Sequence, residues 1–320
     1  MTKRLVVLSL KLSLLFAVIY YLVSTGRLEP RSVLLLAANP LESSSIVFFV
    51  FFGLIGLTGF RWWLLLRSNG FHLSLFRTEQ ILLIAHFFST FLPGAAGIDV
   101  IKSGYLIKYR DAQISSKTPL LTTILLDRLL GVKAILILSC ISLLSMHRTT
   151  FLESLFWLVL LIFLAMAFAL VSFIKGFKIG EMGARKLSAF LKNQVPTKIV
   201  KALSFYETQK KVLFSALATS LLIQMINVLV FYLISRILPS FNADFFQLAA
   251  LVPVGLLLTI IPLGPSGIGA GYIGFDYLFS QLGISGGAEA FNLYILTQLT
   301  INLLCAVAFL FPMPRAASEQ

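Results

Sequence analysis

Charged residues are scarce in this sequence. Of its 320 residues only 12% are Asp, Glu, Lys or Arg, whereas 58% are hydrophobic. A soluble globular domain carries about 25% charged residues, which it needs to cover a water-facing surface. The shortage excludes a water-soluble protein of this size and indicates a chain surrounded by lipid.

Cysteine and the signatures of enzymes are also scarce or missing. Cys140 and Cys305 both lie inside apolar runs, so they form neither a disulfide framework nor a metal-ligand spacing. The H-E-x-x-H and Walker A patterns are missing, and the glycines of 267–271 lack the βαβ context of a dinucleotide site. We therefore expect no cofactor, no metal and no enzymatic activity. Without an ATP site, any transport would be passive or coupled to an ion gradient.

The net charge of +13 raises the question of nucleic-acid binding. The cations, however, sit at the ends of apolar runs, where cytoplasmic loops face anionic lipid. This placement argues against nucleic acid. The partners we expect are membrane phospholipids, and the sequence leaves a homo-oligomer open.

Long apolar runs make up most of the chain. A helix needs about 20 apolar residues to cross the hydrocarbon core of a bilayer. Six runs meet this length without interruption: 5–23, 44–66, 118–146, 151–174, 212–236 and 287–311. The first is too long for a signal peptide and no cleavage site follows it, so we interpret it as an uncleaved helix. The sequence thus predicts an all-α polytopic membrane protein.

Two further apolar regions, 79–107 and 245–282, are interrupted. The breaks contain Pro93 and Gly94 in the first region, and Pro262 and Pro265 in the second. We expect both regions to be re-entrant hairpins. The alternative is two full crossings in each region. Both topologies leave every loop on the same side of the membrane, so the placement of Lys and Arg does not distinguish them.

The two breaks resemble each other. Residues 92–99 read LPGAAGID and residues 261–269 read IPLGPSGIG, each with Pro, then Gly, then Gly-Ile. Within one integral membrane domain, 1–320, this predicts an inverted repeat of the halves 44–146 and 212–311, as in many secondary transporters. The basic segment 175–211 separates the halves. We interpret it as a cytoplasmic linker, with an amphipathic surface helix as the alternative.

The distribution of Lys and Arg predicts the orientation. With the N-terminus inside and both interrupted regions re-entrant, 19 of the 26 cations face the cytoplasm and 4 face outward. Such an excess of Lys and Arg on one side is typical of cytoplasmic loops. We therefore expect a multi-pass protein of the cytoplasmic (inner) membrane with both termini inside.

Several charges lie within apolar runs, where each costs about 2.5–3.5 kcal/mol at mid-span. Asp127 and Arg128 fall roughly 15 Å into their span. Asp99 and Lys102 follow the first break and share a helix face. We expect Asp99 to pair with Arg128 across the hairpin. A site for a charged headgroup or a coupled proton is favoured over an ion pair that only fixes packing.

Other residues are open to two interpretations. Gly97, Gly267 and Gly269 lie where half-helices begin, so they could let a phosphate approach free backbone N–H groups or could serve close helix packing. Arg61, beside Trp62, is explained on spacing alone by snorkelling to the interface. Polar residues in apolar helices could bond helices together or line a pathway: Gln224, Asn227, Asp276, Gln298 and Asn302.

Taken together, these motifs resemble those of a known family. They are Arg61-Trp62 followed by Leu65-Leu66, the run FLPGAAGIDVIKSGYLIKYRD, Asp127-Arg128-x-x-Gly131, and the late break ending Gly267-Ile268-Gly269. Over residues 5–312 the chain is similar to the flippase domain of lysylphosphatidylglycerol synthases. Two positions depart from that family: Lys102 stands where Arg is frequent, and Gly271-Tyr272 replaces a frequent acidic residue, so a role resting on that acid is not carried over.

The resemblance implies translocation of an anionic or aminoacylated phospholipid, or of a polyprenyl-linked lipid. It would use Asp99, Lys102, Asp127, Arg128 and Arg61, with the glycine-rich breaks holding the headgroup. Aminoacyl transfer is not expected, because the chain has no room for the soluble synthase domain. A scaffold or accessory subunit for a lipid-modifying enzyme is the alternative, and a membrane-embedded transferase is a weaker third hypothesis.

Overall fold

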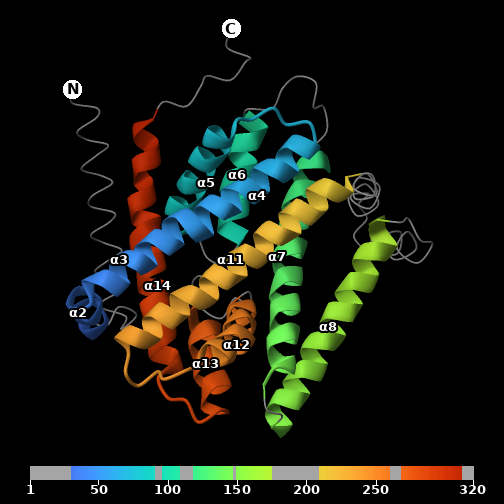
Figure 1. Ribbon diagram of the computed structural model, residues 1–320. Coiled ribbons are helices and arrows are strands. Elements are labelled where there is room, and N and C mark those ends of the chain that lie inside the picture. Colours follow the sequence, from blue (N-terminus) through green and yellow to red (C-terminus); the bar gives the residue numbers. More distant parts are fainter. Residues whose placement is uncertain are drawn as a thin grey trace, which may run out of the picture.

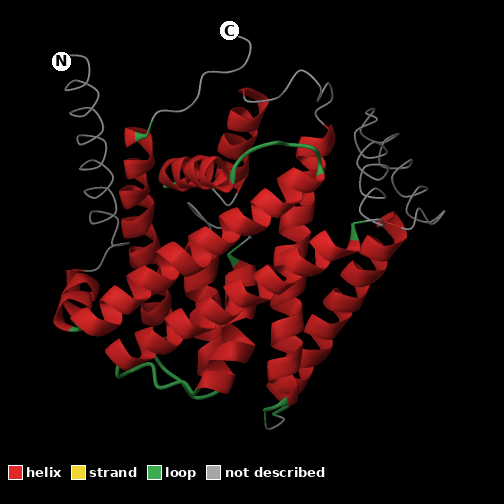
Figure 2. Ribbon diagram, turned by 45° about the horizontal axis from the view of Figure 1, so that its top comes forward, coloured by secondary structure: helices red, strands yellow, loops and turns green. Residues whose placement is uncertain are grey.

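The computed structural model describes residues 30–90, 96–108, 118–146, 149–174, 209–259 and 268–311. In these ranges every regular element is a helix and none is a strand, which confirms the all-α prediction (Figures 1 and 2). The helices are, in chain order, α2 (Pro30–Ala38), α3 (Pro40–Phe48), η1 (Phe49–Gly56), α4 (Leu57–Ser68), α5 (Leu75–Ser89), α6 (Ala96–Lys108), α7 (Thr118–Leu144), α8 (Thr150–Ile174), α11 (Lys210–Ile237), α12 (Phe245–Leu258), α13 (Ile268–Ser280), α14 (Gly287–Leu304) and η4 (Cys305–Leu310).

Four helices of the described chain are long and apolar enough to cross a membrane: Pro40–Ser68, Thr150–Phe168, Lys210–Ile237 and Gly287–Ala308. They coincide with four runs predicted from the sequence, so the protein is a polytopic membrane protein. At 27 residues α7 is also long enough, about 40 Å, although it carries three charges. The predicted first span, 5–23, and nearly all of the basic linker lie outside the described residues.

Each interrupted region forms two short helices that pack against each other, α5 with α6 and α12 with α13. Their lengths of 13 to 15 residues correspond to about 20–22 Å. The breaks themselves, with Pro93, Gly94, Pro262 and Pro265, lie outside the described residues. The helices on either side of each break therefore form a hairpin with arms shorter than a full span.

The two hairpins lie at opposite ends of the molecule, α5–α6 in the upper part of Figure 1 and α12–α13 in the lower part. Between them α4 and α11 pack side by side and run diagonally through the bundle. Both halves have the same order of elements, which is a long helix, a short pair and another long helix. An inverted repeat would produce this order, and the domain boundaries stay a prediction.

Some helical segments were not expected from the sequence. The span Pro40–Ser68 contains an eight-residue π-helix, η1, within otherwise α-helical structure. Inside η1, Gly53 lies against Ile226 of α11, so the two helices approach closely there. A π-helix is often found beside a functional site. Apolar composition predicts a span but cannot distinguish this wider helix from a regular one.

Stacked aromatic rings hold the second half together. Phe231 of α11 stacks on Phe275 of α13 and on Tyr294 of α14, with ring centroids 4.9 and 5.0 Å apart. Phe275 also stacks on Phe291 at 4.9 Å. In lipid, helices associate through such close packing because burial of apolar surface offers little gain. The stack therefore fixes α13 against α11 and α14.

Replacing Gly271 by Ala tests this packing. Gly271 lies against the fully buried ring of Phe291, and an added methyl group would overlap that ring. We expect a loss of about 1–3 kcal/mol, as for other overpacked cores, and a lower unfolding temperature in detergent. The matched control is Gly104→Ala, where the methyl group meets no atom of the described residues within 4 Å and helix propensity improves. Equal unfolding temperatures for the two variants would contradict the packing role.

Candidate functional site

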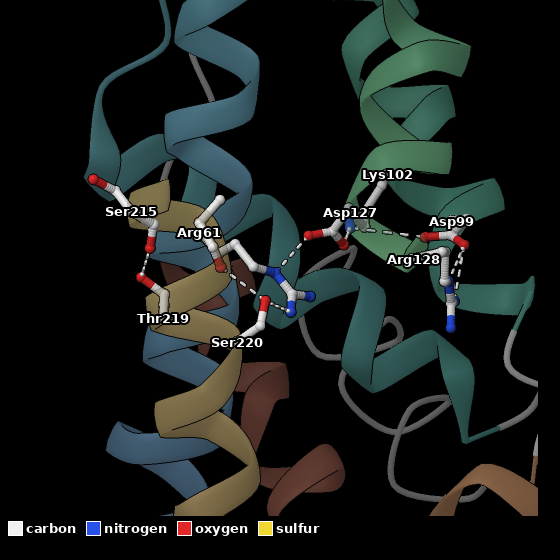
Figure 3. A network of polar contacts seen from close by, with 9 residues as sticks. Arg61, Asp99, Lys102, Asp127, Arg128, Ser215, Thr219 and Ser220 are labelled. Carbon is white, nitrogen blue, oxygen red and sulfur yellow. Dashed lines mark hydrogen bonds and ion pairs between the residues drawn. The ribbon is translucent and has the colours of Figure 1, made fainter. Parts of the chain in front are cut away.

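Five charged side chains from three helices meet inside the bundle (Figure 3): Arg61 on α4, Asp99 and Lys102 on α6, and Asp127 and Arg128 on α7. They form two tight pairs. The Nε atom of Arg61 donates to Asp127 Oδ1 at 2.7 Å, and the guanidinium of Arg128 donates to Asp99 Oδ2 at 2.8 Å. The Asp99–Arg128 pairing predicted from the sequence is therefore confirmed.

Lys102 joins the two pairs into one network. Its Nζ atom lies 3.5 Å from Asp127 Oδ2 and 3.7 Å from Asp99 Oδ1. The ammonium also lies over the ring of Trp62, 4.3 Å from the ring centroid, in a cation–π contact. Only 2% of Lys102 is exposed. The charge is thus held by two carboxylates and an aromatic face rather than by water.

For Arg61 the snorkelling interpretation is wrong. Arg61 is 8% exposed, and its Nη1 atom donates to Ser220 Oγ of α11 at 2.9 Å. The cause is the crossing of α4 beside α11 and α7, which turns this face of α4 into the interior. Spacing along α4 alone could not reveal partners 66 and 159 residues away.

A cavity of about 350 Å³ opens beside the network. Both halves of the chain line it. From the first hairpin come Ile98 and Asp99, in the first turn of α6, and from the second come Leu256 and Thr259, at the end of α12. These residues stand close to the two Pro/Gly breaks. The hairpins, which lie at opposite ends of the bundle, therefore meet at one cavity.

Neutral polar residues form the rest of the polar lining: Thr58, His86, Gln224, Asn227, Thr259, Tyr294 and Gln298. Tyr294 donates to Asn227 Oδ1 at 3.1 Å, and Asn227 Nδ2 donates to Gln224 Oε1 at 3.4 Å. Gln224, Asn227 and Gln298 thus line the cavity. The sequence alone had not decided whether these residues line a pathway or bond helices together. Asn302 instead contacts the ring of His86 at 3.2 Å, and Asp276 is exposed.

The predicted glycines occupy different places. Gly97 is buried in the first turn of α6 and Gly269 is half-buried in the first turn of α13, whereas Gly267 lies outside the described residues. Neither Gly97 nor Gly269 lines the cavity described above. Their role in holding a headgroup stays a prediction.

Three contributors to the site were not predicted from the sequence: Ser220, Tyr294 and the face of Trp62. A sequence pattern could have indicated Ser220, since the polar residues Ser220, Gln224 and Asn227 follow one another at spacings of four and three. Such spacing places polar side chains on one face of a helix, and that face of α11 meets Arg61 and the cavity. Aromatic residues are too frequent in this chain for Tyr294 or Trp62 to stand out.

The fold and the site define a class: an all-α polytopic membrane protein with a charged cavity inside its helix bundle. The chain belongs to the lysylphosphatidylglycerol synthase TM region family, whose profile matches residues 6–308. This family is embedded in the membrane and linked to lipid handling. Searches of curated proteins and of solved structures found no match to the chain.

Proposed function

We propose that this protein translocates lipids between the leaflets of the cytoplasmic membrane and is not an enzyme. Its substrate would be an anionic or aminoacylated phospholipid or a polyprenyl-linked lipid. One observation carries the proposal: five charged side chains of the helices α4, α6 and α7 border an open cavity, namely Arg61, Asp99, Lys102, Asp127 and Arg128. Charges within a membrane are costly and usually mark a pathway. A lipid headgroup is the polar group that must cross the core.

We further propose that both hairpins are re-entrant and meet at the headgroup site. Their arms of about 20–22 Å fall short of the roughly 30 Å hydrocarbon core. Two hairpins that enter from opposite sides would seal the cavity from one leaflet at a time. The ends of α4 and α11 that carry Arg67, Lys210 and Lys211 would face the cytoplasm, in keeping with the positive-inside rule.

Within the network, the pair between Arg128 and Asp99 is the one a headgroup would reach first. The Arg128 side chain is 43% exposed, whereas that of Arg61 is 9% exposed. A phosphate would compete with Asp99 for the guanidinium of Arg128. Loss of the Arg128–Asp99 ion pair would weaken the packing of α7 against α6 and favour movement of the first hairpin.

Replacing Arg128 by Gln tests the proposal. We expect lipid movement in proteoliposomes, followed by dithionite quenching of fluorescent lipids, to fall to the rate of protein-free vesicles. Folding should be retained, because partly exposed ion pairs contribute only about 0–1 kcal/mol. The matched control is Lys133→Gln on the same helix, since Lys133 does not line the cavity, and it should move lipid like the unmodified protein.

Unchanged lipid movement in Arg128→Gln would contradict the site assignment. The accessory-subunit hypothesis makes a different prediction, because it expects no lipid movement by the purified protein and a partner that co-purifies with it. The same preparation therefore distinguishes the two functions.

A further inference from the structure

The cavity has two chemically different walls. The five-charge network on α4, α6 and α7 forms one wall, and Gln224, Asn227, Tyr294 and Gln298 on α11 and α14 form the other. The walls are joined where Arg61 donates to Ser220, which lies one helical turn before Gln224 on α11. A ligand that fills the cavity would thus touch charged and neutral groups at once.

The charged wall has a surplus of one positive charge. Among the described lining residues, the cations are Arg61, Lys102 and Arg128, and the carboxylates are Asp99 and Asp127. Each carboxylate already faces two cations: Asp127 faces Arg61 and Lys102, and Asp99 faces Lys102 and Arg128. An incoming ammonium group would meet occupied carboxylates and net repulsion. A group with one negative charge would balance the wall.

Lys102 is placed to accept such an anion. Its distances of 3.5 and 3.7 Å to the two carboxylates are long, compared with about 2.7–2.9 Å in a tight charge-assisted hydrogen bond. An ammonium has three donors, and neither carboxylate holds one of them closely. A phosphate oxygen could therefore gain a donor here without first breaking a short bond.

The neutral wall is suited to hydroxyl groups. Tyr294, Asn227 and Gln224 form a chain of hydrogen bonds. The chain ends at the amide of Gln224, a residue that is 7% exposed and borders the cavity. An amide both donates and accepts, so it pairs well with a hydroxyl, whereas it offers no charge to an ammonium. At about 350 Å³ the cavity is at the small end of ligand sites, which fits a headgroup with its acyl or prenyl chains left in the bilayer.

We infer that the cavity selects a lipid headgroup with one negative charge and neutral hydroxyls, such as a phosphodiester of glycerol or of a sugar, and discriminates against headgroups that carry an ammonium. This inference rests on the proposed translocation. It narrows the substrate to the anionic class and sets aside the aminoacylated lipids. The phosphodiester can come from a phospholipid or from a polyprenyl phosphate sugar, since both share this chemistry.

A panel of fluorescent lipids in proteoliposomes tests the inference. We expect phosphatidylglycerol to move at least tenfold faster than phosphatidylethanolamine and lysylphosphatidylglycerol. Phosphatidylmethanol, which has the same charge as phosphatidylglycerol and no hydroxyls, should move at an intermediate rate. Addition of an unlabelled polyprenyl phosphate sugar should slow phosphatidylglycerol if the polyprenyl lipid shares the site, and should leave it unchanged if only the phospholipid is taken.

Gln224→Leu removes the amide that borders the cavity. It should abolish the preference for phosphatidylglycerol over phosphatidylmethanol while both lipids still move. Met225→Leu, the adjacent position on α11 and 40% exposed, should keep the preference. Equal rates for all lipids in the unmodified protein, or rapid movement of lysylphosphatidylglycerol, would overturn the inference and leave translocation standing. If no lipid moves faster than in protein-free vesicles, the proposed function fails and the inference fails with it.

Discussion

Replacing Asp127 by Asn is expected to lower the free energy of unfolding by about 3–5 kcal/mol, the cost of removing one partner from a buried ion pair. Asp127 is 5% exposed and receives a 2.7 Å hydrogen bond from Arg61. Lys102 lies 3.5 Å away on its other side. Among the described residues the amide would leave the buried Arg61 without a carboxylate and Lys102 with only Asp99 at 3.7 Å, so the loss should exceed that of a single weakened hydrogen bond.

Unfolding in mixed detergent micelles would measure this loss. Glu153→Gln is the matched control, because Glu153 is an exposed acid at the start of α8 and its removal should change stability by less than about 1 kcal/mol. Similar losses in the two variants would contradict the central place of Asp127 in the network.

A second substitution separates charge balance from lost contacts. Combining Asp127→Asn with Lys102→Met returns the described network to a surplus of one positive charge. We expect the double variant to be more stable than the sum of the two single losses predicts, because residues in one network couple by about 0.5–3 kcal/mol. Strictly additive losses would mean that Lys102 and Asp127 act independently.

Trp62→Ala is expected to have a similarly large effect, about 3–5 kcal/mol, as for other buried aromatic residues cut to Ala. Trp62 is fully buried and packs with Leu66, Phe71, Ile81 and Leu106, which joins α4 to both arms of the first hairpin. Trp157→Ala is the control, because Trp157 is 57% exposed on α8 and loses the same side chain without leaving a hole in the core.

Trp62→Phe would show what the indole contributes beyond a buried apolar ring. Among the described residues the buried Nε1 atom of Trp62 has no hydrogen-bond partner, so removing it spares the protein an unsatisfied donor. The smaller ring, however, is a weaker partner for the ammonium of Lys102, since Trp is the strongest cation–π acceptor. We expect near-normal stability together with reduced lipid movement. A normal rate would show that the cation–π contact does not position Lys102 for transport.

Composition and local spacing were enough to locate four membrane-spanning helices of the described chain and two of the charged contacts. Lipid offers no hydrogen bonds to the backbone, so a long apolar run must become a helix, and the runs at 212–236 and 287–311 did so. Asp99 and Lys102 could be placed together for the same local reason, because residues three apart on a helix are neighbours. The pairing of Asp99 with Arg128 was predicted across the first hairpin, and it forms where α6 packs against α7.

The remaining features depend on which helices cross in space. Arg61 could be recognised as interior only once α4 was seen beside α11, where Ser220 and Asp127 take up its donors. The meeting of both hairpins at one cavity likewise joins Asp99 to Thr259 and Gln224, residues far apart in the chain. Helix crossings are set by close packing, such as that of the Ile226 side chain on Gly53 and of the Phe291 ring on Gly271. Hydropathy carries no information on how two helix surfaces fit together. The charged network and the cavity that it borders were therefore decided by the tertiary structure.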